Sequence, residues 1–225
     1  MAVSKNGLAG ILLGFLLALP GHAADLQGRL VLTGPDGVAD TRDITDAVVF
    51  FKPDASAHGP LPHDTATMLM QHKTFLPHVL AVTIGSTVRF PNDDPILHNA
   101  FSTSPGDQFD LGLYRNGASK TVTFERGGLV RVFCNVHHQM FAYILVLDTP
   151  YIGHVQSGGQ FDLHGLPSGP GELVIWHPRT SVWRQHLDSL AAAPSVVNLH
   201  VIRTGVPAHF NKYGKPYKKD ADSGY

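Results

Sequence analysis

Short apolar runs separated by turn-forming residues constrain the fold of this chain more than any other feature of its sequence. Six runs are rich in β-branched and aromatic side chains and are bounded by Gly, Pro, Asn or Asp: 47–51, 79–84, 87–90, 121–124, 129–133 and 143–147. Runs of this length and composition are typical of strands that end at turns. No segment beyond residue 23 sustains a long apolar period of 3.6 residues, the pattern of an amphipathic helix. We therefore predict an all-β, sandwich-like protein.

A second β region follows a break at residues 148–150, and it alternates strands and turns: 158–163, 166–171, 172–177 and 195–202. This module, 151–205, resembles the small carboxypeptidase-regulatory-like, prealbumin-type sandwiches. It is short for an independent sandwich, and residues 24–60 resemble the opening strands of the same module. We expect 24–60 to pair with 151–203, with a domain spanning 61–150 inserted between them. The alternative is two domains in tandem, with the first strand inside the sheet of 61–150.

Residues 1–23 have the pattern of an export signal. Lys5 precedes an apolar run at 8–19, and Pro20 and small residues up to Ala23 follow. The run is shorter than the roughly 20 residues of a transmembrane helix. We expect cleavage after Ala23, a periplasmic protein and no stable membrane insertion. An uncleaved anchor is the alternative.

Charge argues against a nucleic-acid partner. The formal net charge is −1, and no stripe of Lys and Arg follows any segment, which polyanion recognition would need. Lysines gather instead in residues 206–225, at Lys212, Lys215, Lys218 and Lys219. We expect that segment to be a flexible, solvated tail.

The only cysteine, Cys134, marks the candidate functional site. A single thiol in an exported protein has no disulfide partner within its own chain. His137 follows at +3 and Met140 at +6, and His98 lies upstream near the end of a predicted strand. A thiolate, two imidazoles and a weak thioether form the ligand set of a blue-copper electron-transfer site. Structural zinc is less consistent with this set, because it usually takes more thiolates and has little use for methionine.

The predicted strand at 129–133 brings Cys134 toward the core. Alternation along a strand places Cys134 on the same face as Val130 and Val132, and the following loop returns His137 and Met140 to it. We expect Asn99 to brace the thiolate loop by hydrogen bonding. His138 is expected to be non-ligating, because adjacent loop residues seldom both reach one ion; a second-site ligand is the alternative. His78 is expected to be a solvated loop residue, and the alternative is that it approaches the metal face.

Residues 65–148 resemble the cupredoxin family, with the plastocyanin and amicyanin group nearest. The Cys-x2-His-x2-Met spacing is similar to the short amicyanin loop, and the longer stretch from Phe75 resembles periplasmic methylamine-utilisation-type proteins. The resemblance implies a Greek-key sandwich in which His98, Cys134, His137 and Met140 hold copper. His138 departs from it, because amicyanin has proline directly after its second histidine.

Motifs of catalysis are missing from the sequence. It contains no Gly-x-Ser-x-Gly, no His-Glu-x-x-His, no phosphate-binding glycine loop and no His-x-His pair of a multi-copper site. We therefore expect an electron carrier rather than an enzyme, with a periplasmic dehydrogenase or cytochrome as redox partner. A copper-binding or copper-delivery protein without redox cycling is the first alternative, although the chain has only four methionines. A structural β module with an incidental metal loop is the second.

Overall fold

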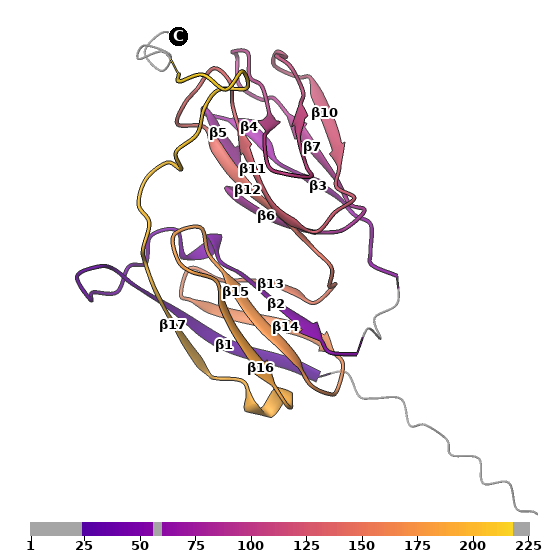
Figure 1. Ribbon diagram of the computed structural model, residues 1–225, viewed down its shortest axis with the longest axis vertical. Coiled ribbons are helices and arrows are strands. Elements are labelled where there is room, and N and C mark those ends of the chain that lie inside the picture. Colours follow the sequence, from indigo (N-terminus) through magenta and orange to yellow (C-terminus); the bar gives the residue numbers. More distant parts are fainter. Residues whose placement is uncertain (1–23, 56–59, 218–225) are drawn as a thin grey trace, which may run out of the picture.

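The computed structural model describes residues 24–55 and 60–217, and nearly all regular structure in these ranges is β-strand (Figure 1). The two helical elements found there are single 3-10 turns, η1 (Ile44–Asp46) and η2 (Leu190–Ala192). The all-β prediction is confirmed. None of the helices in the described part of the chain is long and apolar enough to span a membrane. The predicted export signal, 1–23, lies outside the described residues.

The first body, called here the outer sandwich, is built from both ends of the chain. Its three-stranded sheet has the order β14–β1–β17 and contains β1 (Ala24–Thr33), β14 (Gln160–Leu166) and β17 (Val196–His200). Its four-stranded sheet has the order β13–β2–β15–β16 and contains β2 (Val48–Pro53), β13 (Ile152–His154), β15 (Gly171–Trp176) and β16 (Trp183–Leu187).

The N-terminal segment supplies an inner strand to each of these sheets. β1 runs antiparallel to β14 and parallel to β17, and β2 lies antiparallel between β13 and β15. The large buried side chains between the two sheets come from both ends of the chain: Leu30, Phe51, Phe161, Leu173 and Ile175. The C-terminal strands and the N-terminal strands therefore bury one common core.

The second body, the inserted domain, holds the strands from β3 to β12, drawn in purple to salmon above the outer sandwich (Figure 1). One sheet has the order β10–β7–β3 and contains β3 (Thr65–Thr67), β7 (Thr87–Pro91) and β10 (Ser119–Thr123). The other has the order β6–β12–β11–β8–β9 and contains β6 (Val79–Thr83), β8 (Phe101–Ser102), β9 (Phe109–Asp110), β11 (Gly128–Phe133) and β12 (Phe141–Leu147). A hairpin of β4 (Leu69–Gln71) and β5 (Thr74–Leu76) adds to this domain.

An apolar interface joins the two bodies. Phe50 of β2 and Val174 of β15 pack in one buried cluster with Tyr143, Leu145 and Leu147 of β12. β2 and β12 are therefore covered on both faces, which explains why both read as continuous apolar runs instead of alternating ones. The inserted domain therefore packs on the outer sandwich through β12. The loop between β11 and β12 joins the end of β11 to the start of β12.

Candidate metal centre

Three side chains meet at the end of β11. The Sγ atom of Cys134 lies 3.6 Å from Nδ1 of His137 and 3.8 Å from Nδ1 of His98. All three residues are buried, with exposed fractions of 0% for Cys134 and His98 and 4% for His137. In the described part of the chain they form the one group of three or more His, Cys, Asp or Glu ligand atoms close enough to hold a metal ion.

The spacing of these atoms fits a shared ion. Nitrogen and sulfur atoms bound to one metal ion at about 2.0–2.3 Å lie roughly 3.5–3.8 Å apart when the angle at the metal is between tetrahedral and trigonal. Both measured separations fall in that interval. The donor set is soft sulfur with two imidazoles, which copper and zinc bind well and which magnesium and calcium do not favour.

The β11–β12 hairpin positions two of the three donors. Val130 and Val132 share the core face of β11 with Cys134, so the thiol points inward where the strand ends. The loop that follows is closed by backbone bonds, because Cys134 N–H donates to the carbonyl of Met140 at 3.0 Å and Met140 N–H donates to the carbonyl of His137 at 3.0 Å. These two bonds fix the conformation of the short Cys-x2-His-x2-Met loop, which places the ring of His137 beside the thiol.

Met140 lies in the same buried cluster as Cys134 and is fully covered. Its position at the closure of the loop is compatible with a role as the fourth, weaker ligand. That role stays a prediction.

His98 comes from the connection between β7 and β8 and is held there by a backbone bridge. Its N–H donates to the carbonyl of Tyr114 at 3.2 Å, and its carbonyl accepts from Tyr114 N–H at 3.0 Å. Asn92, fully buried, steadies the approach: its Nδ2 donates to the carbonyls of Ile96 and Tyr114, and its Oδ1 accepts from Asp94 N–H. The backbone that leads to His98 is thus held by hydrogen bonds of one buried side chain.

Asp94 orients the ring of His98, and sequence reasoning missed it as a site residue. Nε2 of His98 lies 2.6 Å from a carboxylate oxygen of Asp94, and both side chains are buried. A proton held on Nε2 by the carboxylate leaves the lone pair of Nδ1 directed at the ion position. The i,i+4 spacing of Asp94 and His98 is visible in the sequence, but it has this meaning only once the loop is known to fold back.

The carboxylate of Asp94 is itself held by the β4–β5 hairpin. It accepts from the backbone N–H groups of His72 at 2.7 Å and Lys73 at 2.8 Å, the two turn residues with φ of 55° and 57°. Burial acts to raise the pKa of Asp94, but the N–H of Lys73, the ring of His98 and the N–H of His72 outweigh it and hold the pKa below its ordinary value. Asp94 is therefore an ionised partner for His98.

Asn99 differs from its expected role. Its Nδ2 donates to Asp110 Oδ1 at 2.8 Å and to the carbonyl of Gly112 at 3.1 Å, and its Oδ1 is buried without a hydrogen-bond partner among the described residues. The amide therefore braces the β9 region and not the thiolate loop. The reason is that His98 faces the loop, so the next side chain along an extended backbone points the other way.

His138 and His78 lie outside the donor cluster. The ring of His138 stacks on His209 with centroids 5.0 Å apart and planes 5° apart. His78 faces the outer sandwich, where its Nδ1 lies 2.6 Å from Asp46. It was expected to be a solvated loop residue, and it instead bridges the two bodies.

The segment 203–217, called here the C-terminal strap, reaches the metal loop. It leaves the outer sandwich after β17 and runs up beside the inserted domain, drawn in yellow in Figure 1. His209 lies between Phe133 (4.0 Å) and His138, and Lys212 N–H donates to Asn135 Oδ1. Tyr217 Oη donates to the carbonyl of Cys134 at 2.9 Å.

These contacts differ from the solvated tail that the sequence suggested. The Nζ of Lys212 lies 2.7 Å from Asp110, whose other oxygen accepts from Asn99, so the strap is tied to the residue next to His98. Lys212 is therefore half-buried, whereas Lys215 is exposed, as expected for a solvated tail. Residues 218–225, with Lys218 and Lys219, lie outside the described residues.

Comparison with known proteins gives matches among solved structures. No protein-family model matches the chain, and no curated protein matches it. A copper-containing nitrite reductase from Thermus scotoductus SA-01 is similar at 25% identity over 44% of this chain and 26% of that chain, with a TM-score of 0.37. A purple cupredoxin from Nitrosopumilus maritimus is similar at 22% identity over 36% of this chain and 99% of that chain, with a TM-score of 0.33.

A Cu(I) form of an amicyanin mutant is also similar, at 16% identity over 37% of this chain and 82% of that chain, with a TM-score of 0.35. The chain spans about a quarter of the length of the nitrite reductase. At these TM-scores the likeness is partial, so the assignment of the metal depends on the donor atoms described above.

Proposed function

We propose that the inserted domain is a cupredoxin that binds one type 1 copper ion and carries single electrons between redox partner proteins in the periplasm. The observation that carries this proposal is the buried convergence of Cys134 Sγ with the Nδ1 atoms of His98 and His137. A copper ion in this set supplies a one-electron couple between Cu(II) and Cu(I).

The surroundings of the donors support electron transfer over other uses of the metal. Cys134 and His137 belong to a loop closed by backbone bonds, and His98 is held by Tyr114 and Asp94. A set of ligands that cannot move keeps one geometry for both oxidation states, so little reorganisation accompanies the gain or loss of an electron. Met140 is proposed as the fourth ligand, where a weak thioether tunes the potential.

The burial of the three donor side chains favours an electron carrier over a copper-delivery protein. A protein that hands copper to another must present ligands that an acceptor can reach, whereas these three donors have exposed fractions of 0–4%. We propose that the chain is a carrier and not an enzyme, with a periplasmic dehydrogenase or cytochrome as partner. The periplasmic location depends on the predicted signal at 1–23.

Titration of the purified protein with Cu(II) tests the proposal. We expect an intense visible band from thiolate-to-copper charge transfer at one equivalent of copper. Cys134→Ser should fold and lose the band, because the soft, covalent ligand is gone. A colourless, weakly bound copper complex in the unaltered protein, or a band that survives in Cys134→Ser, would contradict the proposal.

Met140→Leu separates the axial role from the equatorial ones in the same experiment. Because a weak axial ligand contributes little to holding the metal, this variant should retain copper and the band while its reduction potential rises. Complete loss of copper from Met140→Leu would argue for a different coordination geometry.

A further inference from the structure

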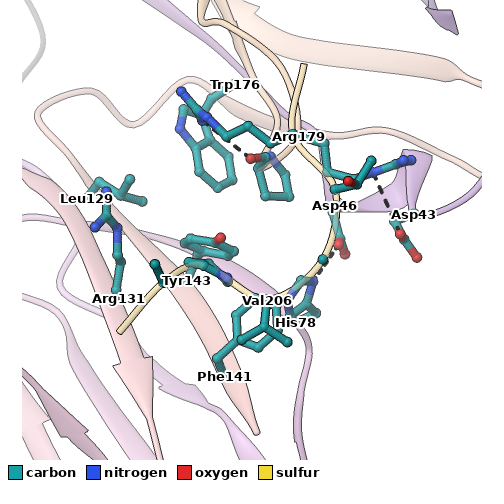
Figure 2. Close-up of a pocket in the computed structure, with 16 residues that line it drawn as sticks. Asp43, Asp46, His78, Leu129, Arg131, Phe141, Tyr143, Trp176, Arg179 and Val206 are labelled. Atoms are coloured by element: carbon teal, nitrogen blue, oxygen red, sulfur yellow. Dashed lines mark hydrogen bonds and ion pairs between the residues drawn. The ribbon is translucent and has the colours of Figure 1, made fainter. Parts of the chain in front are cut away.

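A cavity of about 760 Å³ lies where the outer sandwich meets the inserted domain (Figure 2). β11 and β12 line it on one side, the ends of η1 and β15 on the other, and residues 203–208 of the C-terminal strap close part of its rim. Its volume falls within the range of small-molecule sites, which occur preferentially between domains. The proposed electron carrier has no use for this space.

One wall of the cavity is aromatic. Phe141, Tyr143 and Trp176 follow one another along it in Figure 2, with ring centroids 5.9 Å apart for the first pair and 5.4 Å for the second. Trp176 comes from the outer sandwich and the other two from β12, so the wall exists only because the two bodies are joined. The rings meet edge to face, with planes 88° and 66° apart, and Tyr143 is only 7% exposed, so Phe141 and Trp176 offer more of the accessible aromatic surface.

The charged side chains divide the cavity into a balanced end and a cationic end. At the balanced end, Arg179 lies 2.8 Å from Asp40 and 3.8 Å from Asp43, and His78 lies 2.6 Å from Asp46. Each of these groups already has a partner within the protein. A ligand gains little net Coulomb attraction there.

At the cationic end, Arg131 and Arg203 line the cavity without an ion-pair partner among residues 24–55 and 60–217. The one side-chain hydrogen bond of Arg203 there is a long one, 3.5 Å, to the carbonyl of Pro178. Arg131 lies opposite Tyr143 in the β11–β12 ladder, and Arg203 lines the same cavity beside Pro178. Burial raises the pKa of the Tyr143 hydroxyl; the positive charges of Arg131 and Arg203 act against that rise, and the carboxylate of Asp46 adds to it.

We propose that this cavity is a binding site for a small aromatic carboxylate, whose carboxylate pairs with Arg131 and Arg203 while its ring lies against the aromatic wall. Guanidinium groups bind carboxylates through parallel N–H···O bonds, which neither an alcohol nor an amide can match. The site is independent of the metal, because none of its lining residues is one of the proposed ligands.

Calorimetric titration of the purified full chain with three probes tests the class of ligand. Benzoate carries both the ring and the charge, benzamide keeps the ring without the charge, and acetate keeps the charge without the ring. We expect benzoate to bind, and benzamide and acetate to bind at least tenfold more weakly. No binding of benzoate, or equal binding of either of the other probes, would overturn the proposal.

Variants test the residues. Arg131→Gln and Arg203→Gln should each weaken benzoate binding roughly tenfold, about the worth of one hydrogen bond to a charged group. Arg184→Gln is the matched control, since Arg184 pairs with Glu172 on the surface of the outer sandwich, and it should leave the affinity unchanged. Unchanged affinity in both cavity variants would refute the assignment.

Cys134→Ser should bind benzoate as tightly as the unaltered chain. This variant tests the two proposals separately. A chain that fails to bind benzoate can still show the copper band, and a chain without the copper band can still bind benzoate. Loss of benzoate binding in Cys134→Ser would overturn the claim that the site is independent of the metal.

Discussion

His137 and His138 are neighbours in the chain, but the fold gives their rings different surroundings. Nδ1 of His137 lies 3.6 Å from the thiol in the core, whereas His138 is half-buried and stacks on His209 of the C-terminal strap. A tight loop places consecutive side chains on different sides, so only one of two adjacent imidazoles reaches the ion. The sequence spacing of +3 from Cys134 had already favoured His137.

Paired alanine variants decide between the two rings. His137→Ala should abolish the visible copper band, because it removes one of three strong donors. His138→Ala should keep the band, because the ring of His138 packs on His209 and Tyr217, outside the donor cluster. Spectra of both variants at one equivalent of Cu(II) are the measurement, and the opposite pattern would move the ligand to His138.

Among the elements, the short β4–β5 hairpin helps to position a proposed metal ligand. Its turn supplies two N–H groups to Asp94, and Asp94 holds Nε2 of His98. The hairpin therefore acts on the metal centre through a single carboxylate. Removing such a partner of a metal-bound imidazole typically lowers metal affinity 10- to 100-fold.

Asp94→Asn should accordingly weaken copper binding by about one to two orders of magnitude. The amide keeps the size of the side chain but has one neutral acceptor oxygen in place of two charged ones. It therefore cannot accept hydrogen bonds both from the N–H groups of the turn and from Nε2 of His98. Affinity is measured by competition with a chelator of known strength. Asp93→Asn is the matched control, because Asp93 is exposed and its side chain contacts Gln71. Equal affinities in the two variants would show that Asp94 does not position the ligand.

At the scale of the whole molecule, the apolar interface couples the two bodies. Leu145 of β12 is 4% exposed and packs in the cluster that contains Phe50 and Val174 of the outer sandwich. Because each body covers apolar surface of the other, unfolding one exposes the other to water. We expect the intact protein to unfold in one transition.

Two probes follow the bodies separately in denaturant. Trp176 and Trp183, the only tryptophans, belong to the outer sandwich, and the copper band reports the inserted domain. Leu145→Ala should lower the stability seen by both probes by about 2–5 kcal/mol, the usual cost of truncating a buried leucine. Leu129→Ala, at a position 38% exposed in the same sheet, should cost much less. A change confined to the copper band would show that the interface does not couple the two bodies.

Part of this architecture could be predicted because it is local. All six apolar runs contain strand residues, and the strand 129–133 with its short loop places Cys134 and His137 together by chain connectivity alone. The very short strands β3, β8, β9 and β13 have no comparable signal, since two or three residues carry no period. Side-chain partners were missed for a different reason: the contact of Asp94 with His98 depends on how the loop folds back, and that of His209 with Phe133 joins residues far apart in the chain.

The sequence by itself determined the all-β class and the residue types of the candidate metal centre, because short apolar runs bounded by turns and a short ligand loop are properties of contiguous residues. Only the tertiary structure decided which ring nitrogen of His98 faces the thiol, where Asn99 and Lys212 bind, and that a cavity lined by Arg131 and Arg203 opens between the bodies. These features bring together residues many positions apart. Their distances are set by how sheets pack on one another, and packing depends on every side chain of both faces at once.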